Sequence, residues 1–282
     1  SSSPRSGTSG VVAGGVREAK LASSLTFHAS FDRGTDADYA RGDAWLYHAP
    51  GMDKWSEAKP GLPAGGTVKV VPGEGQFGGA LRFPEKADPV VFYRAAGNLP
   101  WVRSEWGGTV SLWLRADFGE LAKGFSDPVQ ITPRGWNDAA FFVEFEKRAA
   151  DVPFRLGAYA DFRVWNPRNL KWEDIAPADR PLVTVDGPPF SGTRWTHVAF
   201  TWERFNTGRP DGQAVLFLDG VQVGVLRGRT QTFTWDPAET RMVLGVGYVG
   251  WLDELAVFDR PLAAEEIQAV RRLPRGIASL RR

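Results

Sequence analysis

The chain has 282 residues, 43% of them hydrophobic and 24% charged, so it is long enough to bury one large core and too apolar to stay disordered. Its 34 Lys and Arg residues nearly balance 33 Asp and Glu residues, and no basic stripe interleaves with aromatic residues, which argues against nucleic acid as a partner. The absence of cysteine excludes disulfides, thiolate metal sites and cysteine nucleophiles.

The two ends of the chain are predicted to lie outside the folded domain. Residues 1–24 open with a run rich in Ser and Gly and show no signal peptide, so we expect a flexible linker or a trimmed segment. Residues 272–282 carry several arginines and are expected to form a solvated basic tail. Residues 25–271 are predicted to form one domain, and no apolar run reaches the roughly 20 residues of a membrane span.

Short strands in which apolar and polar residues alternate dominate residues 25–271. The first covers residues 25–32, and the segment 32–66, dense in Asp, Gly and Pro, is expected to be an ordered loop that wraps the fold. Further strands are predicted over residues 78–83, 90–93, 108–115, 141–147, 154–162, 195–202, 214–218, 221–224, 242–246 and 251–258. Asp219-Gly220 predicts a tight hairpin turn, because glycine readily adopts a positive φ.

One helix is predicted, over residues 263–271, with Ile267 and Val270 as its apolar stripe. Many short strands followed by a single terminal helix indicate an all-β sandwich. The segment 163–189 interrupts the strand pattern with Trp, Asn, Pro and Asp residues. Because long loops in compact domains tend to be functional or disordered, this insertion is a candidate site.

Three tryptophans, Trp136, Trp165 and Trp172, fall in polar, turn-rich loops, where an exposed indole can stack on the face of a sugar. Polar side chains beside them can supply hydrogen bonds to such a ligand. The candidates are Arg163, Asn166 and Arg168. The alternative is that these tryptophans pin the long loops onto the sandwich.

Four segments together resemble the laminin-G-like family, which shares the concanavalin-A-like sandwich of legume lectins, pentraxins and several glycan-active enzymes. They are GTVSLWL at 108–114, RWTHVAF at 194–200, LFLDG at 216–220 and GWLDELAVFDRPL at 250–262. The strand that ends in Phe31-Asp32 resembles the first strand of the family, so the likeness covers residues 25–271. It implies a concanavalin-A-like jelly roll of two antiparallel sheets, with long loop insertions and one short C-terminal helix.

The resemblance also implies one structural calcium ion, because the family often holds calcium near its first and last strands. Asp32 and Asp253 match those positions, and calcium prefers oxygen ligands. The alternative is that both carboxylates cap turns or accept backbone hydrogen bonds. No organic cofactor is expected, and His197 lies in a core-like strand, which favours a structural histidine over a metal ligand.

Glu144 and Glu146 are the candidate catalytic pair. Two residues apart on one strand face, they lie about 6 to 7 Å apart, within the range that glycan hydrolysis uses. Glycosidases of this fold, however, resemble one another through a Glu-x-Asp-x-x-Glu arrangement, which Glu144-Phe145-Glu146-Lys147 lacks. The resemblance therefore counts against this chemistry, and a solvated strand face is the alternative.

Members of the family commonly bind glycans on a concave sheet face. Here the polar side of the strands carries Trp113, Arg115, Glu144, Glu146 and His197, and Arg115 is a further candidate ligand-binding residue. We therefore expect a non-catalytic recognition module of an exported bacterial protein, located outside the cell, in the periplasm or at the cell surface, with a glycan or cell-surface polysaccharide as its ligand. The alternatives are a glycoside hydrolase or polysaccharide lyase, and a structural or adhesive module that contacts another protein.

Overall fold

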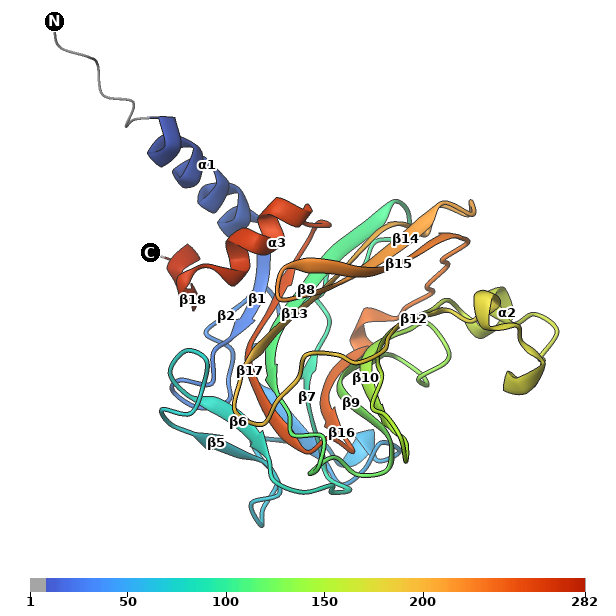
Figure 1. Cartoon of the computed structure of the whole chain (residues 1–282), viewed down its shortest axis with the longest axis horizontal. Helices are drawn as coiled ribbons and strands as arrows, with labels where there is room; N and C mark the ends of the chain where they lie inside the picture. Colours follow the sequence, from blue (N-terminus) through green and yellow to red (C-terminus); the bar gives the residue numbers. More distant parts are fainter. Residues whose placement is uncertain (1–8, 282) are drawn as a thin grey trace, which may run out of the picture.

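The computed structural model describes residues 9–281, so residues 1–8 of the expected linker and Arg282 of the expected tail lie outside the described residues. Two antiparallel sheets pack face to face (Figure 1). Sheet A has the strand order β15-β14-β13-β8-β17-β1-β2, with β6 paired to β17 and β5 to β6. Sheet B has the order β12-β11-β10-β9-β16-β7-β3-β4. The predicted sandwich of two antiparallel sheets is confirmed.

The strands of sheet A are β1 (Leu25–Ala29), β2 (Tyr39–Ala40), β5 (Lys69–Val71), β6 (Ala80–Phe83), β8 (Trp106–Arg115), β13 (Thr196–Phe205), β14 (Gly212–Leu218), β15 (Val221–Arg229) and β17 (Gly250–Phe258). Those of sheet B are β3 (Leu46–Ala49), β4 (Lys59–Pro60), β7 (Val90–Arg94), β9 (Gly124–Thr132), β10 (Ala140–Lys147), β11 (Phe154–Tyr159), β12 (Leu182–Val185) and β16 (Arg241–Val246). The helices are α1 (Ser9–Ser24), α2 (Phe162–Trp165) and α3 (Ala264–Arg271), with short 3-10 turns η1 (Trp55–Glu57), η2 (Trp172–Asp174), η3 (Pro177–Asp179), η4 (Pro237–Glu239) and η5 (Ala278–Leu280), and a last strand β18 (Pro274–Ile277).

The core lies between the two sheets and follows the alternation of the sequence. Leu112 and Leu114 of β8 are buried in the same cluster as Phe141 and Phe145 of β10. Side chains on the opposite parity of each strand point to the outer faces of the sandwich. The Asp219-Gly220 turn joins β14 to β15 as predicted, with both residues at positive φ. The strand pattern thus decides which side chains reach an outer face.

The two chain ends differ from the sequence-based expectation. Helix α1 occupies most of the segment expected to be a flexible linker, and its Leu21 is fully buried. The expected basic tail forms β18 and η5, where Ile277 and Leu280 are buried with Leu21 on the outer face of sheet A. The arginines there stay at the surface while the apolar residues between them pack inward. The spacing of these apolar residues, rather than the charge of the arginines, therefore decides the conformation of this segment.

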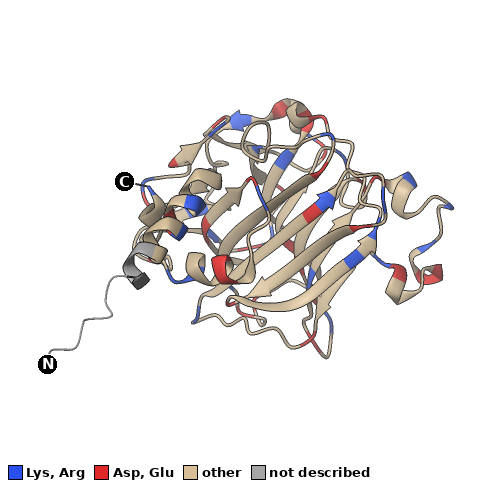
Figure 2. Cartoon of the chain, turned by 90° about the horizontal axis from the view of Figure 1, so that it is seen from above, with Lys and Arg blue, Asp and Glu red and all other residues tan. Residues whose placement is uncertain are grey.

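The outer faces of the two sheets are covered differently. Helix α3 packs Ile267 and Val270 onto sheet A, in one cluster with Phe217 and Phe258. On sheet B, the insertion that contains α2 projects beyond β10 and β12 (Figure 1). Acidic and basic residues are interspersed along the chain in Figure 2, without an extended block of one sign. None of the helices in residues 9–281 combines the length and the apolar composition needed to cross a membrane.

Candidate functional site

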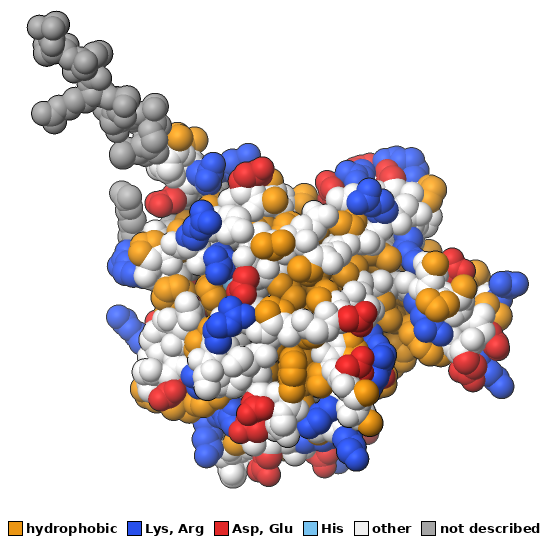
Figure 3. Space-filling model, viewed as in Figure 1, with side chains coloured by type: hydrophobic (Ala, Val, Ile, Leu, Met, Phe, Trp, Pro, Cys, Tyr) orange, Lys and Arg blue, Asp and Glu red, His pale blue; other side chains and the backbone are white. Residues whose placement is uncertain are grey.

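A cavity of about 690 Å³ opens on the outer face of sheet B, and we call it the sheet B cavity. Outward-facing side chains of β9 to β12 form its floor, and the insertion after β11 contributes its rim. Figure 3 shows hydrophobic side chains, with charged ones beside them, between the sandwich and the projecting insertion. The residues that line it include Phe125, Asp127, Gln130, Trp136, Phe142, Glu144, Glu146, Arg148, Arg155, Tyr159, Trp172 and Arg180.

The strand register sets the floor of this cavity. On β10 the core takes Phe141, Val143 and Phe145, so Phe142, Glu144 and Glu146 face outward. The neighbouring strand β11 pairs Arg155 with Glu144 and Gly157 with Phe142. A Cβ at Gly157 would lie 2.3 Å from the ring of Phe142, so the glycine leaves room for that ring across the sheet. The floor is therefore part aromatic and part charged.

Arg155 joins the two predicted catalytic carboxylates. Its Nη1 donates to Glu144 Oε1 at 3.2 Å and its Nη2 donates to Glu146 Oε2. Glu146 Oε2 also accepts from Arg148 Nη2 at 2.8 Å. On β9, Gln130 Nε2 donates to Asp127 Oδ2 at 2.8 Å. The floor thus holds three carboxyl groups, each with at least one hydrogen-bond donor.

Burial decides the charge of these carboxyl groups. It raises the pKa of Asp127 well above its ordinary value, and the neighbouring Glu144 carboxylate raises the pKa of Asp127 further. Burial also raises the pKa of Glu144, while Arg155 opposes that shift. Burial would raise the pKa of Glu146 too, but hydrogen bonds from Arg148 and Arg155 bring it below its ordinary value. Of these carboxyl groups, Asp127 therefore retains a proton most readily, and the arginine-bound Glu146 ionises most readily.

Exposed aromatic rings surround the charged floor. The ring of Trp136, 49% exposed, meets that of Tyr159 edge-on with centroids 5.5 Å apart. Trp172, 38% exposed, carries the Arg180 guanidinium 4.5 Å from its ring. Phe125, near the start of β9, is 62% exposed. Flat apolar surfaces beside fixed donors and acceptors suit a ligand that is apolar on its faces and polar at its edges.

The predicted loop residues divide into two groups. Trp136 and Trp172 line the cavity. Trp165 instead packs against Tyr159 and donates its Nε1–H to Asn137 O at 2.8 Å, and Asn166 is buried with its amide bonded to the backbone of Leu170. Trp165 and Asn166 thus have the loop-pinning contacts of the alternative interpretation.

The remaining loop candidates, Arg163 and Arg168, are exposed and do not line the cavity. Their role in ligand binding stays a prediction.

The polar strand residues do not share one face. Glu144 and Glu146 lie on sheet B, whereas Trp113, Arg115 and His197 lie on sheet A. His197 is fully buried, with its Nε2 2.8 Å from Ser111 Oγ, and burial lowers its pKa to about 3. These contacts fit a structural histidine. Arg115 lines a separate cavity, of about 660 Å³, on the outer face of sheet A.

Asp32 and Asp253, the predicted calcium ligands, both accept hydrogen bonds from the backbone of the loop before β6. Asp32 Oδ1 accepts from Gly79 N at 2.9 Å, and Asp253 accepts from Phe77 N at 3.0 Å and Glu254 N at 2.8 Å. Burial raises the pKa of Asp253 to about 9, with Glu254 and Asp32 adding to the shift.

Backbone donors therefore satisfy these oxygens, as in the alternative interpretation. No group of three metal-ligating side chains occurs among residues 9–281. This donor set does not provide a calcium site by itself, and the ion stays a prediction.

Sequence reasoning missed Asp127, Gln130 and Arg155. The first two lie on β9, a strand that was not predicted because Pro128 interrupts it. Arg155 lies on a predicted strand, and its outward parity was a usable signal. Its pairing with Glu144 depends on the register between β10 and β11, which the sequence does not specify.

Comparisons with known proteins agree with this architecture. The family model of the concanavalin A-like lectin/glucanases superfamily, of laminin G type, matches residues 95–268. The chain belongs to this superfamily. No curated protein matches the sequence.

Solved structures similar to this superfamily member include domain 4 of an extracellular arabinanase from Geobacillus stearothermophilus in complex with arabinotriose. That match has a TM-score of 0.53 and 17% identity, and covers 86% of this chain and 96% of that one. The receptor binding domain of botulinum neurotoxin C/D mosaic serotype matches with a TM-score of 0.57 and 12% identity, over 89% of this chain and 51% of that one. The binding domain of Paraclostridial Mosquitocidal Protein 1 matches with a TM-score of 0.55 and 11% identity, over 89% and 52%. This chain thus spans about half the length of the two toxin domains, and at these identities the likeness shows the fold.

Proposed function

We propose that this chain is a carbohydrate-binding module of an exported protein, and that the sheet B cavity holds the glycan. The observation that carries the proposal is the placement of two exposed indoles, Trp136 and Trp172, beside the hydrogen-bonded charges of Arg155, Glu144 and Glu146. The arabinanase domain solved with arabinotriose, which has this fold, supports the ligand class. That enzyme is extracellular, which supports a location outside the cytoplasm.

The proposed binding mode follows from the chemistry of the cavity. The apolar faces of sugar rings stack on Trp136 and Trp172. Sugar hydroxyls donate to the Glu146 carboxylate, and the O–H of Asp127, in the protonated form that its raised pKa favours, donates to a sugar oxygen. Because Arg155 already holds both glutamates, these acceptors are fixed before the ligand arrives.

A glycan array followed by calorimetry with the best oligosaccharide tests the proposal. We expect the double variant Trp136→Ala/Trp172→Ala to bind about tenfold to a hundredfold more weakly, since each stacking platform contributes on the order of 1 kcal/mol. Trp45→Ala is the matched control, because Trp45 is 54% exposed and does not line the cavity. Unchanged affinity of the double variant, or equal losses in both proteins, would remove the sheet B cavity as the site.

The enzyme alternative is tested with the same ligands by looking for cleavage products. Products that disappear in Glu144→Gln would make the chain a glycan-active enzyme. Binding without products supports the recognition module. The absence of binding to any glycan on a broad array would favour the structural or protein-binding module.

A further inference from the structure

Arg115 is largely buried and yet unsatisfied. Its side chain is 17% exposed, its guanidinium donates no hydrogen bond to any described residue, and its Nε is buried without a partner. By contrast, Arg155 donates to two glutamates, and Arg241, also 17% exposed, donates to the carbonyl oxygen of Glu239 at 3.0 Å. Burying unpaired donors costs free energy, so an acceptor that completes Arg115 would be bound favourably.

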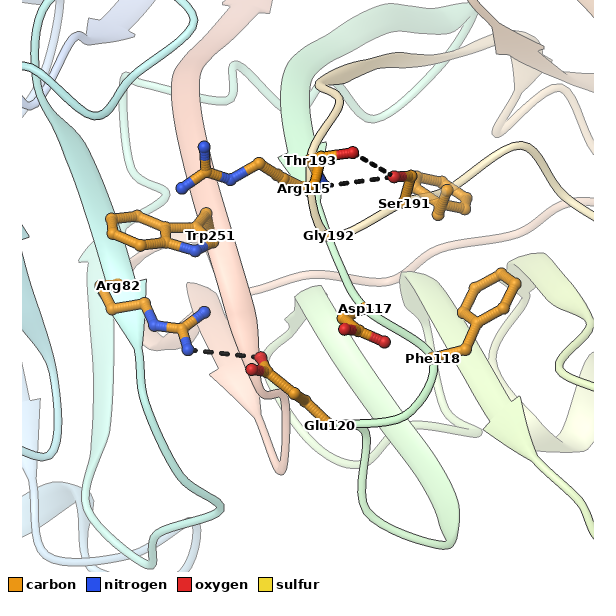
Figure 4. A pocket seen from close by; sticks show the side chains of 10 residues that line it. Arg82, Arg115, Asp117, Phe118, Glu120, Ser191, Gly192, Thr193 and Trp251 are labelled. Atoms are coloured by element: carbon orange, nitrogen blue, oxygen red, sulfur yellow. Dashed lines mark hydrogen bonds and ion pairs between the residues drawn. The ribbon is translucent and has the colours of Figure 1, made fainter.

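Aromatic stacking, rather than hydrogen bonding, holds Arg115 in place. The strand register places Arg82, Trp251 and Arg115 side by side on β6, β17 and β8. The Arg115 guanidinium lies 4.4 Å from the Trp251 ring and 5.3 Å from that of Trp195, and Figure 4 shows Arg82 on the other side of Trp251. Stacking fixes the plane of a guanidinium and leaves its N–H edge free to donate.

The carboxylate that the chain itself offers to Arg115 is only weakly held. Glu74 Oε2 lies 3.5 Å from Arg115 Nη2, and the Glu74 side chain is 52% exposed. Arg82 in contrast donates to Glu120 Oε2 at 3.3 Å. An exposed carboxylate at the longer distance is readily exchanged for a better acceptor, because surface ion pairs contribute little free energy.

The cavity in front of Arg115, which we call the sheet A cavity, has a volume of about 660 Å³ and shares no lining residue with the sheet B cavity. Carboxylates and hydroxyls also line it, from Asp117, Glu120, Ser191 and Thr193 (Figure 4). Asp117 uses Oδ1 to accept from Gly119 N at 2.8 Å, while its Oδ2 accepts from no described residue. Thr193 Oγ1 lies 3.1 Å from Ser191 Oγ. The cavity therefore offers the N–H edge of Arg115 as a free donor and Asp117 Oδ2 as a free acceptor.

We propose that the sheet A cavity is a second ligand site, for an acidic sugar unit whose carboxylate binds Arg115 and whose hydroxyls bind Asp117 and Thr193. The guanidinium fork matches a carboxylate in two parallel hydrogen bonds. A simple anion offers no hydrogen-bond donor to Asp117, whereas a neutral sugar offers Arg115 no counter-charge. A hydroxylated carboxylate supplies acceptors to Arg115 and a hydroxyl donor to Asp117.

The test follows the indole N–H signal of Trp251 by NMR while the full chain is titrated with galacturonate, glucuronate, glucose, sulfate and acetate. The variant Trp251→Phe assigns the signal. We expect a saturable shift with a uronate, at an affinity at least tenfold higher than with glucose, sulfate or acetate. Equal affinity for glucose, or for sulfate and acetate alone, would overturn the proposal.

Arg115→Gln is expected to weaken uronate binding at least tenfold, whereas Arg241→Gln leaves it unchanged. Arg241 is the matched control because it is equally buried and stacks on Trp55 at 4.4 Å, but already has an acceptor. If Arg115→Gln does not fold, Thr193→Ala on the exposed rim replaces it, with an expected weakening of about threefold. Uronate affinity unchanged in the folded variant would refute the site, whatever the sheet B cavity binds.

Discussion

The outer faces of the two sheets carry strands of similar pattern but meet different surroundings. On sheet A, α3, β18 and the end of α1 bury an apolar patch around Phe217 and Phe258. On sheet B, the carboxyl groups, the arginine and the aromatic rings of strands β9 to β12 line the sheet B cavity instead. Polar residues at alternate positions of a strand therefore mark the side chains that reach an outer face. Whether that face becomes a second core or a binding surface depends on the elements that pack over it.

We expect the largest loss of unfolding free energy on the outer face of sheet A that α3 covers. Ile267 is fully buried between α3 and sheet A, so Ile267→Ala should lower the free energy of unfolding by about 2–5 kcal/mol. Trp172→Ala, on the open face, should lower it by less than about 1 kcal/mol, because the ring is partly exposed. Urea unfolding of both variants measures the contrast. Similar losses would mean that the insertion on sheet B is as much a part of the core as α3.

A pH titration sharpens the same contrast at Asp253 on sheet A. Its pKa of about 9 in the folded chain lies above the ordinary 3.8, so the folded state binds the proton more tightly. The stabilisation is complete below pH 4 and is lost as the pH rises towards 9, by about 1.4 kcal/mol per pH unit. Asp253→Asn should therefore flatten the fall in stability between pH 5 and 8, measured as melting temperature.

If the predicted calcium ion is bound, stability does not fall with rising pH in this titration. A cation held by Asp32 and Asp253 keeps both carboxylates ionised, so added calcium would raise the melting temperature and remove the slope, and Asp32→Ala would abolish that response. A melting temperature that calcium and chelator leave unchanged would eliminate the ion.

We expect a still smaller effect at Asp127, the carboxyl group on sheet B whose pKa burial raises. Asp127→Asn keeps a neutral side chain that still donates, so glycan affinity at neutral pH should change by less than about threefold. Because the raised pKa of Asp127 costs stability as the pH rises, the variant should also be more stable than the parent chain under alkaline conditions. Calorimetry at pH 7 and thermal melts at pH 9 check both; a loss of affinity beyond tenfold would mean that Asp127 acts as a carboxylate.

Much of the sandwich follows from local pattern. The strands β10, β13 and β17 and the hairpin turn at Asp219-Gly220 lie where alternation and turn chemistry predict them. Helix α1 and strand β18 were missed because their stability comes from distant partners, such as the contact of Leu21 with the cluster around Leu280.

The site was predictable only in part. The outward parity of Glu144 and Glu146 was readable from the strand, and the composition of the loops indicated Trp136 and Trp172. The link through Arg155 was not readable, since it depends on cross-strand register. The assignment of Arg115 to the opposite face from Glu144 was likewise hidden, because parity does not say to which sheet a strand belongs.

The bridge from Arg155 to Glu144 and Glu146 also constrains how the sheet B cavity can diverge. A single change at Arg155 would leave the buried Glu144 without a counter-charge beside Glu146, which would keep only Arg148, and this is costly. Replacing all three side chains together by apolar ones of similar size removes that cost. The three positions are therefore expected to vary as a block among relatives, so that ligand preference changes in jumps rather than one residue at a time.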